Sequence, residues 1–460
     1  MADPVRNRRE PRALNDADVD AAIGRIEARD PARARDARHV YDDLTWGTGP
    51  GALTQSGVQD WAWYRLATKY LTDEPDHMSR MAGIAAELFD ELGLDAYAAV
   101  CRSEATARVH EAFDRSDRDG FDAMRKAVTA SGIEPPDLDD FEWGRIMGVE
   151  EANARSAVEG ALERAIAVGG LVVGGRNWRT RQRDITAQAL HADHPSQPGQ
   201  SWRTAIVTER LGTWADADAA RSKALTRLRA GMARRLLHPI AAPPDVAERM
   251  EPLTWLLDRI GDEQPLTQSG YLSTAFLRLV HEEHPWNDPF APEKPPRTEA
   301  DAFTLRLLRS QLMAMGALRR RGLTLKRTAR GAAMTTDPVA AWTALTRSVP
   351  ADPWRRFVLE TSALMLVDQG RPVPPREVTA LVTQIAAEVG WRAKGARRGQ
   401  DPAEPNVSWA ISDGLALYEL LGMLVDDGDW LNRHWTLMPS GTSTLLATLR
   451  TVATGPSSAP

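Results

Sequence analysis

An internal repeat constrains this chain more than any other feature of its sequence. Residues 44–57 read LTWGTGPGALTQSG, and residues 253–270 read LTWLLDRIGDEQPLTQSG. Each segment holds LTW, a gap and LTQSG, and the two copies lie almost half the chain apart. A shared pentapeptide alone can arise by chance, but the matched LTW ahead of each copy makes chance a poor explanation. The pattern predicts a tandem duplication of roughly residues 40–238 and 250–450.

The C-terminal part of the second half indicates what one repeated unit contains. Apolar spacing predicts a helix over 353–370 that ends at a glycine. The Pro-Pro pair at 374–375 is typical of a new helix start, and the apolar stripe after it ends at Gly390. A polar loop, a helix over 408–425, a short turn-rich β segment and a final helix follow. Three helices and then a β-hairpin is the order of a winged helix.

The first unit of the second half repeats this order. Residues 308–334 combine a helix, Gly316, a turn at Gly322 and a strand over 323–328. We therefore expect a mainly α protein, formed by tandem duplication of winged-helix-like units that are helical with a short β-hairpin. The alternative is another mostly helical repeat with hairpin insertions.

The length of 460 residues exceeds one ordinary core, so several domains are expected. A helix over 213–238 is interpreted as the connector between the halves, because its acids come early and its bases late. The predicted boundaries are an N-terminal helical or partly disordered segment (1–39), four winged-helix-like units (40–130, 131–238, 250–350 and 351–450) and a disordered tail (451–460).

Three segments of the second half also resemble a known family. They are LTQSGYL, GALRRRGLTLKRTARG and LGMLVDDGDWLNRHWTLMPSG. They resemble the helical, winged-helix-like region of actinobacterial plasmid ORF-type proteins, the pRiA-type ORF-three family. The resemblance covers residues 250–450 and, more weakly, 40–238, without the α+β domain that names the family. It implies a winged-helix-like fold and no particular activity.

Basic clusters point most directly to a partner. The segment 319–330 contains no acidic residue, and on a winged helix it lies at a helix end and on the wing; its basic residues are Arg319, Arg320, Arg321, Lys326, Arg327 and Arg330. A second cluster surrounds Trp178 at the expected hairpin of the first half and consists of Arg176, Arg179, Arg181 and Arg183. Guanidinium groups there would neutralise phosphates and release counterions. The alternative is that they complement helix dipoles on a solvated surface, and the net charge of −6 weighs against nucleic acid.

The sequence lacks the familiar motifs for catalysis, metals and cofactors. The pairs HADHP (191–195) and HEEHP (281–285) place histidines three residues apart, but neither matches H-E-x-x-H, and we interpret them as histidines at helix ends. The segment VGGLVVGGR (168–176) lacks the phosphate-loop patterns and is interpreted as a hairpin turn. The single cysteine, Cys101, excludes an intrachain disulfide. We expect no catalytic residue, no metal and no cofactor.

Compartment and partners follow from these absences. No apolar run approaches the length of a membrane span, and residues 1–20 lack the apolar core of a secretory signal, so we expect the cytoplasm and no membrane partner. The leading hypothesis is a non-catalytic, DNA-associated or regulatory protein that contacts duplex DNA through basic wings. A protein-interaction scaffold is the alternative, and an enzyme with a histidine and carboxylate site between units is the third candidate.

Overall fold

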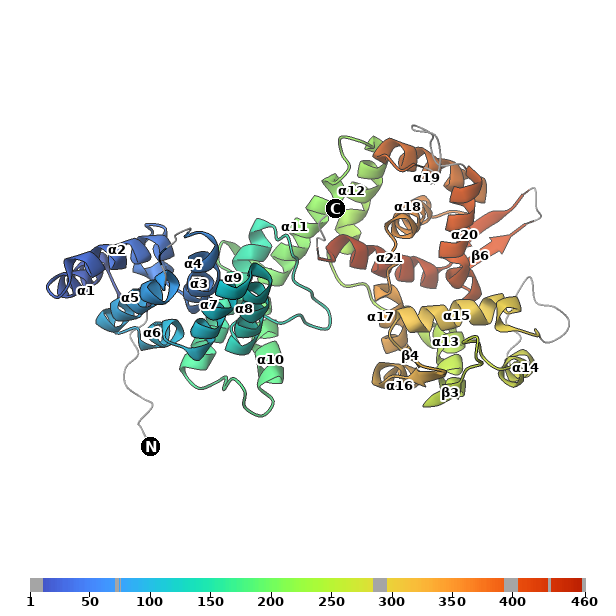
Figure 1. The fold of residues 1–460 in the computed structure, drawn as a ribbon. Helices are drawn as coiled ribbons and strands as arrows, with labels where there is room; N and C mark the ends of the chain where they lie inside the picture. The colour runs from blue at the N-terminus through green and yellow to red at the C-terminus, as the bar shows by residue number, and fades with distance from the viewer. Residues whose placement is uncertain are drawn as a thin grey trace. The chain divides into compact units, whose positions relative to one another are not determined.

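Helices predominate in this protein, and its strands form three small antiparallel sheets (Figure 1). The computed structural model describes residues 11–70, 74, 76–283, 296–392, 404–428 and 432–456. The prediction of a mainly α protein is confirmed. Among these residues, no helix combines the length and the apolar character that a membrane crossing requires.

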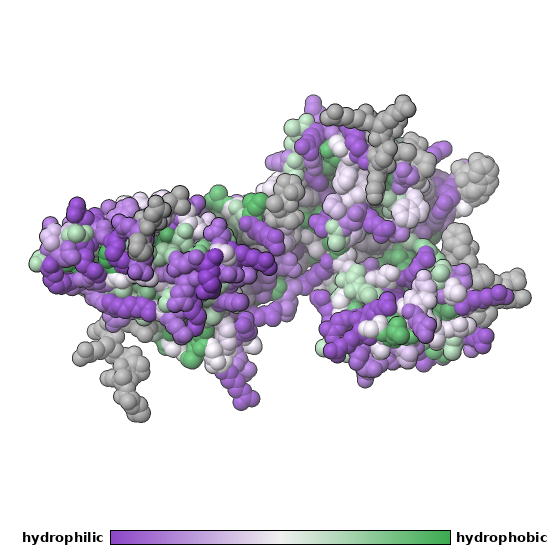
Figure 2. Space-filling view, in the orientation of Figure 1, coloured by the Kyte–Doolittle hydropathy of each residue, from purple (hydrophilic) through white to green (hydrophobic). Residues whose placement is uncertain are grey.

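The chain divides into two compact units. Unit 1 comprises residues 1–143 and 147–205, and unit 2 comprises residues 144–146 and 206–460. On the face drawn in Figure 2, hydrophilic side chains cover most of each unit, and hydrophobic residues occur in small separate spots. The apolar side chains of each unit are mostly inside it, in two separate cores.

Unit 1 is a helical assembly whose main apolar cluster comes from the segment up to α8, with Trp61 and Phe89 fully buried in it. Polar side chains begin several of its helices; Asp30, for example, caps α2 by accepting from the backbone of Ala32 (2.9 Å). Its elements are η1 (Pro11–Ala13), α1 (Asp16–Glu27), α2 (Pro31–Thr45), η2 (Pro50–Ala52), α3 (Gln55–Asp60), the π-helical turn η3 (Trp61–Arg65), α4 (Leu66–Thr68), α5 (His77–Leu92), α6 (Asp95–Cys101), α7 (Glu104–Arg115), α8 (Asp117–Ser131), α9 (Val149–Ala167), α10 (Trp178–His191), β1 (Asp193–His194), β2 (Gln197–Ser201) and the start of α11 (Trp202–Asp216).

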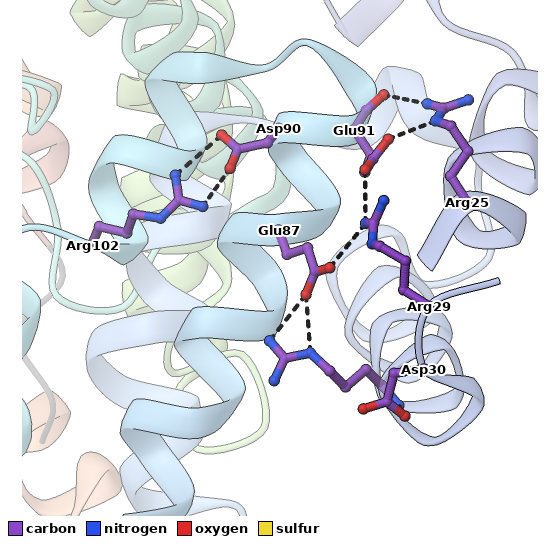
Figure 3. A network of polar contacts seen from close by, with 8 residues as sticks. Arg25, Arg29, Asp30, Glu87, Asp90, Glu91 and Arg102 are labelled. Carbon is purple, nitrogen blue, oxygen red and sulfur yellow. Dashed lines mark hydrogen bonds and ion pairs between the residues drawn. The ribbon is translucent and has the colours of Figure 1, made fainter. Parts of the chain in front are cut away.

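A network of ion pairs joins α5 to the region of α1 and α2 on the surface of unit 1 (Figure 3). Glu91 accepts from Arg25 (2.6 Å) and Arg29 (2.8 Å), and Glu87 accepts from Arg29 (2.9 Å) and Arg33 (3.0 Å). The hydrogen bond from Arg25 lowers the pKa of Glu91 below its ordinary value. Each charge in this network has an opposite partner, so the network is a surface contact between helices and adds little to stability.

The winged-helix-like unit predicted over 40–130 is wrong. Apart from residues 71–73 and 75, which lie outside the described part, this region contains helices and no strand. A winged helix needs a hairpin after its third helix, and the described chain here continues from helix to helix. The shared LTQSG pentapeptide was a local match only. The segments that follow its first copy favour helix and contain no glycine turn between β-favouring residues.

The hairpin predicted around Trp178 is also absent. Helix α9 ends at Ala167, glycine-rich turns follow, and α10 begins at Trp178. Gly169 and Gly174 have positive φ (72° and 79°), so the segment between the helices reverses direction without strand pairing. The described sheet of unit 1, β1 with β2, lies after α10 instead.

Unit 2 contains the other two sheets. Its elements after α11 are α12 (Lys223–Leu236), α13 (Val246–Ile260), β3 (Glu263–Pro265), α14 (Thr274–Glu283), η4 (Glu299–Asp301), α15 (Phe303–Ala314), β4 (Leu318–Arg321), β5 (Thr324–Arg327), α16 (Ala329–Thr336), α17 (Pro338–Arg347), α18 (Pro353–Gln369), α19 (Pro375–Val389), α20 (Glu404–Leu420), β6 (Leu424–Asp427), β7 (His434–Leu437) and α21 (Pro439–Thr454). One continuous apolar core runs through these elements.

Residues 213–238 form two helices in place of the predicted connector. Helix α11 ends at Asp216, and Ser222 caps α12 by accepting from the backbone of Leu225 (3.2 Å). Arg229 of α12 forms a buried ion pair with Glu360 of α18 (Nε to Oε1, 2.8 Å). The helix therefore belongs to the core of unit 2, because its buried charge is matched there.

Two segments of unit 2 repeat one order of elements. The first module (residues 246–336) runs α13, β3, α14, α15, β4 and β5, and β5 lies between β3 and β4. The second module (residues 353–454) runs α18, an extended bridge at Val373, α19, α20, β6 and β7. Val373 pairs with Trp435 of β7, so β7 lies between this bridge and β6. The order of helices and strands is therefore the same in both modules.

A glycine shapes both modules at the same place. Gly331 and Gly441 lie in the first turn of the helix that follows each hairpin. A Cβ on Gly331 would collide with the carbonyl oxygen of Ala317, and a Cβ on Gly441 would collide with that of Met423. Each of these carbonyls also accepts a backbone hydrogen bond from the end of its hairpin (3.0 Å in both). The helix therefore begins against the start of the hairpin in both modules, where only glycine fits.

Candidate nucleic-acid interface

The basic run 319–330 lies largely on the hairpin of the first module, as predicted. Strands β4 and β5 pair antiparallel, with Arg319 opposite Lys326 and Arg321 opposite Thr324. Gly322 has a φ of 61° in the two-residue turn between them, and the predicted turn at this glycine is confirmed. Leu318 and Leu325 are buried beneath the hairpin and fix it on the core.

Three consecutive arginines occupy the outer strand. Arg319, Arg320 and Arg321 are exposed, and none has an acidic partner among the described residues. Arg320 donates to the carbonyl of Gly322 (2.9 Å). Its guanidinium lies over Gly270, so a Cβ at position 270 would collide with it. Arg319 and Arg321 are two residues apart on the strand and therefore point to the same side of the sheet. This row is the densest unneutralised positive charge on the hairpin.

The inner strand, β5, differs from β4. The run 319–330 contains no acidic residue, but two acids from another segment lie beside β5 in the folded chain. Lys326 forms an ion pair with Glu263 of β3, and Arg327 pairs with Asp262 (3.1 Å). Strand β3 is the neighbour of β5 in the sheet, so these acids arrive from a distant part of the chain. Lys326 and Arg327 are thus neutralised within the module and are poor candidates for phosphate contact.

Arg330 lies on α16 and not on the hairpin. Its guanidinium donates to the carbonyl of Met315 at the end of α15 (3.3 Å). Cations are favoured near the C-terminus of a helix, so this contact is explained by the helix dipole. Arg330 remains exposed beside the hairpin.

Helix α15 adds a basic residue that the sequence analysis missed. Its exposed side chains recur at helical spacing and include Phe303, Arg306, Ser310 and Met313. The guanidinium of Arg306 lies over the ring of Phe303 (5.9 Å to the centroid) and has no acidic partner among the described residues. The exposed positions of a predicted helix over this segment would have indicated Arg306.

A buried ion pair fixes α15 to the second LTQSG copy. Glu299 is 2% exposed and pairs with Arg309 of α15 (2.5 Å). Glu299 also accepts from the backbone of Leu272 (2.7 Å), and Arg309 donates to the carbonyl of Gly270 (3.0 Å). This pair holds the turn over 266–272 against the helix, so Arg309 is positioning α15 and is not free to meet a ligand.

The second basic cluster does not form a comparable row. Arg176 lies in the turn before α10, and the other three lie on α10 itself. Arg179 stacks on Trp178 (4.7 Å), and Arg183 pairs with Asp139 (2.5 Å). Arg181 lies two residues from each of these on a helix, so it points away from both. The arginines on α10 therefore point in different directions around the helix, whereas a hairpin would have placed them along one strand.

The remaining candidates for chemistry are structural. No group of three or more histidine, cysteine or carboxylate side chains in the described ranges is arranged to hold a metal ion. His194 is buried and meets Glu150 (2.9 Å), whereas His284 lies outside the described residues. Burial raises the pKa of the Cys101 thiol to about 12, so it is not a reactive thiolate.

A cavity of about 180 Å³ lies in unit 1. Small and apolar residues line most of its wall, together with Asp95, Tyr97, Glu163 and Arg164. One oxygen of Glu163 accepts from the Tyr97 hydroxyl (2.6 Å) and the other from the backbone of Gln55 (3.0 Å). Both carboxylate oxygens are therefore engaged in holding the first LTQSG copy.

Comparisons of this chain with protein-family models, with curated protein sequences and with solved structures give no match.

Proposed function

We propose that this chain binds duplex DNA through a basic surface formed by β4 and the exposed face of α15. The observation that carries the proposal is the exposed row Arg319, Arg320 and Arg321 without an acidic partner in the described chain. Arginine stays charged at all physiological pH values and donates to phosphate oxygens in a fork geometry. Arg319 and Arg321 lie on the same side of an extended strand, about 7 Å apart, so both can face one DNA backbone.

The proposal includes a winged-helix assignment for both modules of unit 2. Its support is the shared order of helices and strands and the shared glycines at Gly331 and Gly441. In helix-turn-helix folds, the last helix of the motif enters the major groove. In the first module that helix is α15, and the hairpin β4–β5 is the wing beside it.

The two elements have different roles in this proposal. The arginines of β4 contact phosphates, and Arg306 and Ser310 of α15 face the base edges. Phosphate contacts position a protein without reading sequence, whereas base contacts specify. Since three arginines lie on the strand and a single unpaired one on the exposed face of α15, we expect strong salt dependence and weak sequence preference.

The test is an anisotropy titration of a labelled duplex with the full chain. Three phosphate contacts contribute about −2.7 to the slope of log affinity against log salt between about 50 mM and 200 mM. The triple variant Arg319→Ala, Arg320→Ala and Arg321→Ala should lose that part of the slope.

The matched control removes three positive charges from unit 1. Arg108, Arg115 and Arg125 are exposed on α7 and α8, and their joint replacement by alanine should leave DNA binding unchanged. The proposal fails if the wild-type chain does not bind at the lower salt concentration. It also fails if the β4 variant keeps the wild-type slope.

One observation favours a protein-interaction scaffold as a second candidate. Phe303 and Met313 are 37% and 39% exposed on the same face of α15 as Arg306. Aromatic residues, methionine and arginine are enriched at protein interfaces. A nuclease-treated pull-down that recovers a stoichiometric protein partner, together with a failed DNA titration, would favour the scaffold.

A further inference from the structure

The outer strands of the two modules each have one unpaired edge. Strand β4 pairs with β5 alone and β6 with β7 alone, and they belong to separate sheets. No backbone hydrogen bond in the described chain joins the free edge of either strand to another segment. An exposed edge presents backbone donors and acceptors that can pair with a further strand.

These two edges have the same length and opposite charge. Strand β4 reads LRRR and β6 reads LVDD, and the leucine that begins each strand is buried. Arg320 lies opposite the buried Leu325, and Asp426 lies opposite the buried Trp435, so the two positions correspond. Asp426 already meets Arg433 of its own hairpin, whereas Asp427 is exposed without an ion pair to the described residues.

We propose that β4 of one copy of this chain pairs with β6 of a second copy. Parallel pairing in register brings Arg320 to Asp426 and Arg321 to Asp427. Antiparallel pairing brings Arg320 to Asp426 and Arg319 to Asp427. In both directions two opposite-charge pairs form across the new strand pair, which is the arrangement that stabilises neighbouring strands.

The resulting contact is head to tail. The surface that β4 offers differs from the surface that β6 offers, so a pair of associated copies still has one free β4 edge and one free β6 edge. Such contacts continue into longer assemblies unless the geometry closes a ring. This inference does not depend on DNA binding, because the second copy is the partner and no nucleic acid takes part.

The experiment measures the mass of the full chain by analytical ultracentrifugation over a wide range of protein concentration, after nuclease treatment. At low salt of about 50 mM the average mass should rise with concentration beyond that of a dimer or to that of a closed ring. At about 500 mM salt, where the screening length is only a few ångströms, the association should weaken strongly.

Charge reversal makes the test specific. Replacing Arg319, Arg320 and Arg321 by glutamate should give a monomer, and Asp426→Lys with Asp427→Lys should also give a monomer. An equal mixture of the two variants should associate again, because each then offers the charge that the other lacks. Glutamate at Arg108, Arg115 and Arg125 is the matched control and should associate like the wild type.

Two outcomes overturn the proposal. The first is a wild-type chain that stays monomeric at low salt over the whole concentration range. The second is a mixture of the two reversed variants that does not associate. A misfolded variant cannot produce recovery in the mixture, so recovery supports the strand pairing itself. Failure here leaves the DNA titration unaffected, because a chain that stays monomeric keeps β4 available to the duplex.

Discussion

The two hairpins of unit 2 have the same construction and opposite surfaces. Both follow a helix that ends at a glycine with positive φ, Gly316 in one and Gly422 in the other, and both begin with a buried leucine. The outer strand continues as three arginines in the first hairpin and as valine and two aspartates in the second. The buried positions fix the backbone, and the exposed edge is free to take either charge. Similarity of fold therefore does not transfer a binding surface from one module to the other.

The largest effect on the free energy of unfolding is expected from the buried ion pair between Glu299 and Arg309 in the first module. Glu299→Ala leaves Arg309 without its carboxylate and the backbone of Leu272 without its acceptor. Breaking a buried ion pair from one side costs about 3–5 kcal/mol. Chemical denaturation of the full chain should show this loss in the transition of unit 2.

Two further variants control for that result. Glu299→Gln keeps an oxygen acceptor for Leu272 and should lose less stability than the alanine variant. Glu282→Ala removes an exposed carboxylate of α14 and should change the free energy of unfolding by less than about 0.5 kcal/mol. Equal losses for Glu299→Ala and Glu282→Ala would show that the buried pair does not support the module.

The shared glycines test whether the hairpins are built alike. Gly331→Ala and Gly441→Ala each force a Cβ against a backbone carbonyl, which must move. Overpacking of this kind costs about 1–3 kcal/mol, and we expect similar losses in the two modules. Gly414→Ala in α20 has open space around the new methyl group and should be neutral or stabilising. A large loss for one glycine and none for the other would break the comparison.

An exchange of the outer strands tests what the charge does. Arg319→Val, Arg320→Asp and Arg321→Asp together give β4 the sequence of β6. Duplex affinity at low salt should fall at least about tenfold, because about three phosphate contacts are lost. Arginine at Val425, Asp426 and Asp427 should restore affinity to the exchanged chain if the hairpin alone determines binding. Anisotropy titrations of the three chains decide this, and no recovery would show that α15 is also required.

The smallest effect on stability is expected from a difference between α15 and α20, the third helices of the two modules, near their C-terminal ends. Glu419 of α20 and Met313 of α15 each lie three residues before the glycine that ends the helix. Burial raises the pKa of Glu419 above its ordinary value. A carboxyl whose pKa is higher in the folded chain stabilises it below the unfolded pKa, and this stabilisation is lost as the pH rises through the folded pKa.

Glu419→Met should therefore stabilise the second module at neutral pH and remove this pH dependence. Solvent reaches part of the side chain, so the gain should stay below about 1 kcal/mol. Thermal melts at acidic and neutral pH measure both quantities. A variant that loses stability equally at both pH values would contradict the assignment to the carboxyl group.

The second module was the part that the sequence predicted best. The helix over 353–370 is α18, which ends before Gly370 (φ 59°), and the helix after the Pro-Pro pair is α19. Helix α20 ends at Leu420, earlier than predicted, because the chain turns at Gly422 into β6. Glycine, proline and apolar spacing act over a few residues, so they can be recognised without knowledge of the rest of the chain.

The candidate site was predicted only in part. The hairpin and the arginines of β4 were recognisable, because a glycine turn between strand-forming residues is a local pattern. The acids that neutralise Lys326 and Arg327 are Glu263 of β3 and Asp262 just before it, far away in sequence, and the pairing of β3 with β5 places them there. The same limitation applies to the arginines around Trp178, where a helix separated side chains that a hairpin would have aligned.

The LTQSG copies show where sequence stops and tertiary structure begins. In the first copy Thr54 caps a helix that includes Gly57, whereas in the second Thr267 begins a turn in which Gly270 has a φ of 79°. The five residues alone determined that a turn or a helix start occurs, since threonine, serine and glycine favour both. The choice between them depends on what packs against the backbone, Glu163 in one copy and the Glu299–Arg309 pair in the other, and only the folded chain brings those groups there.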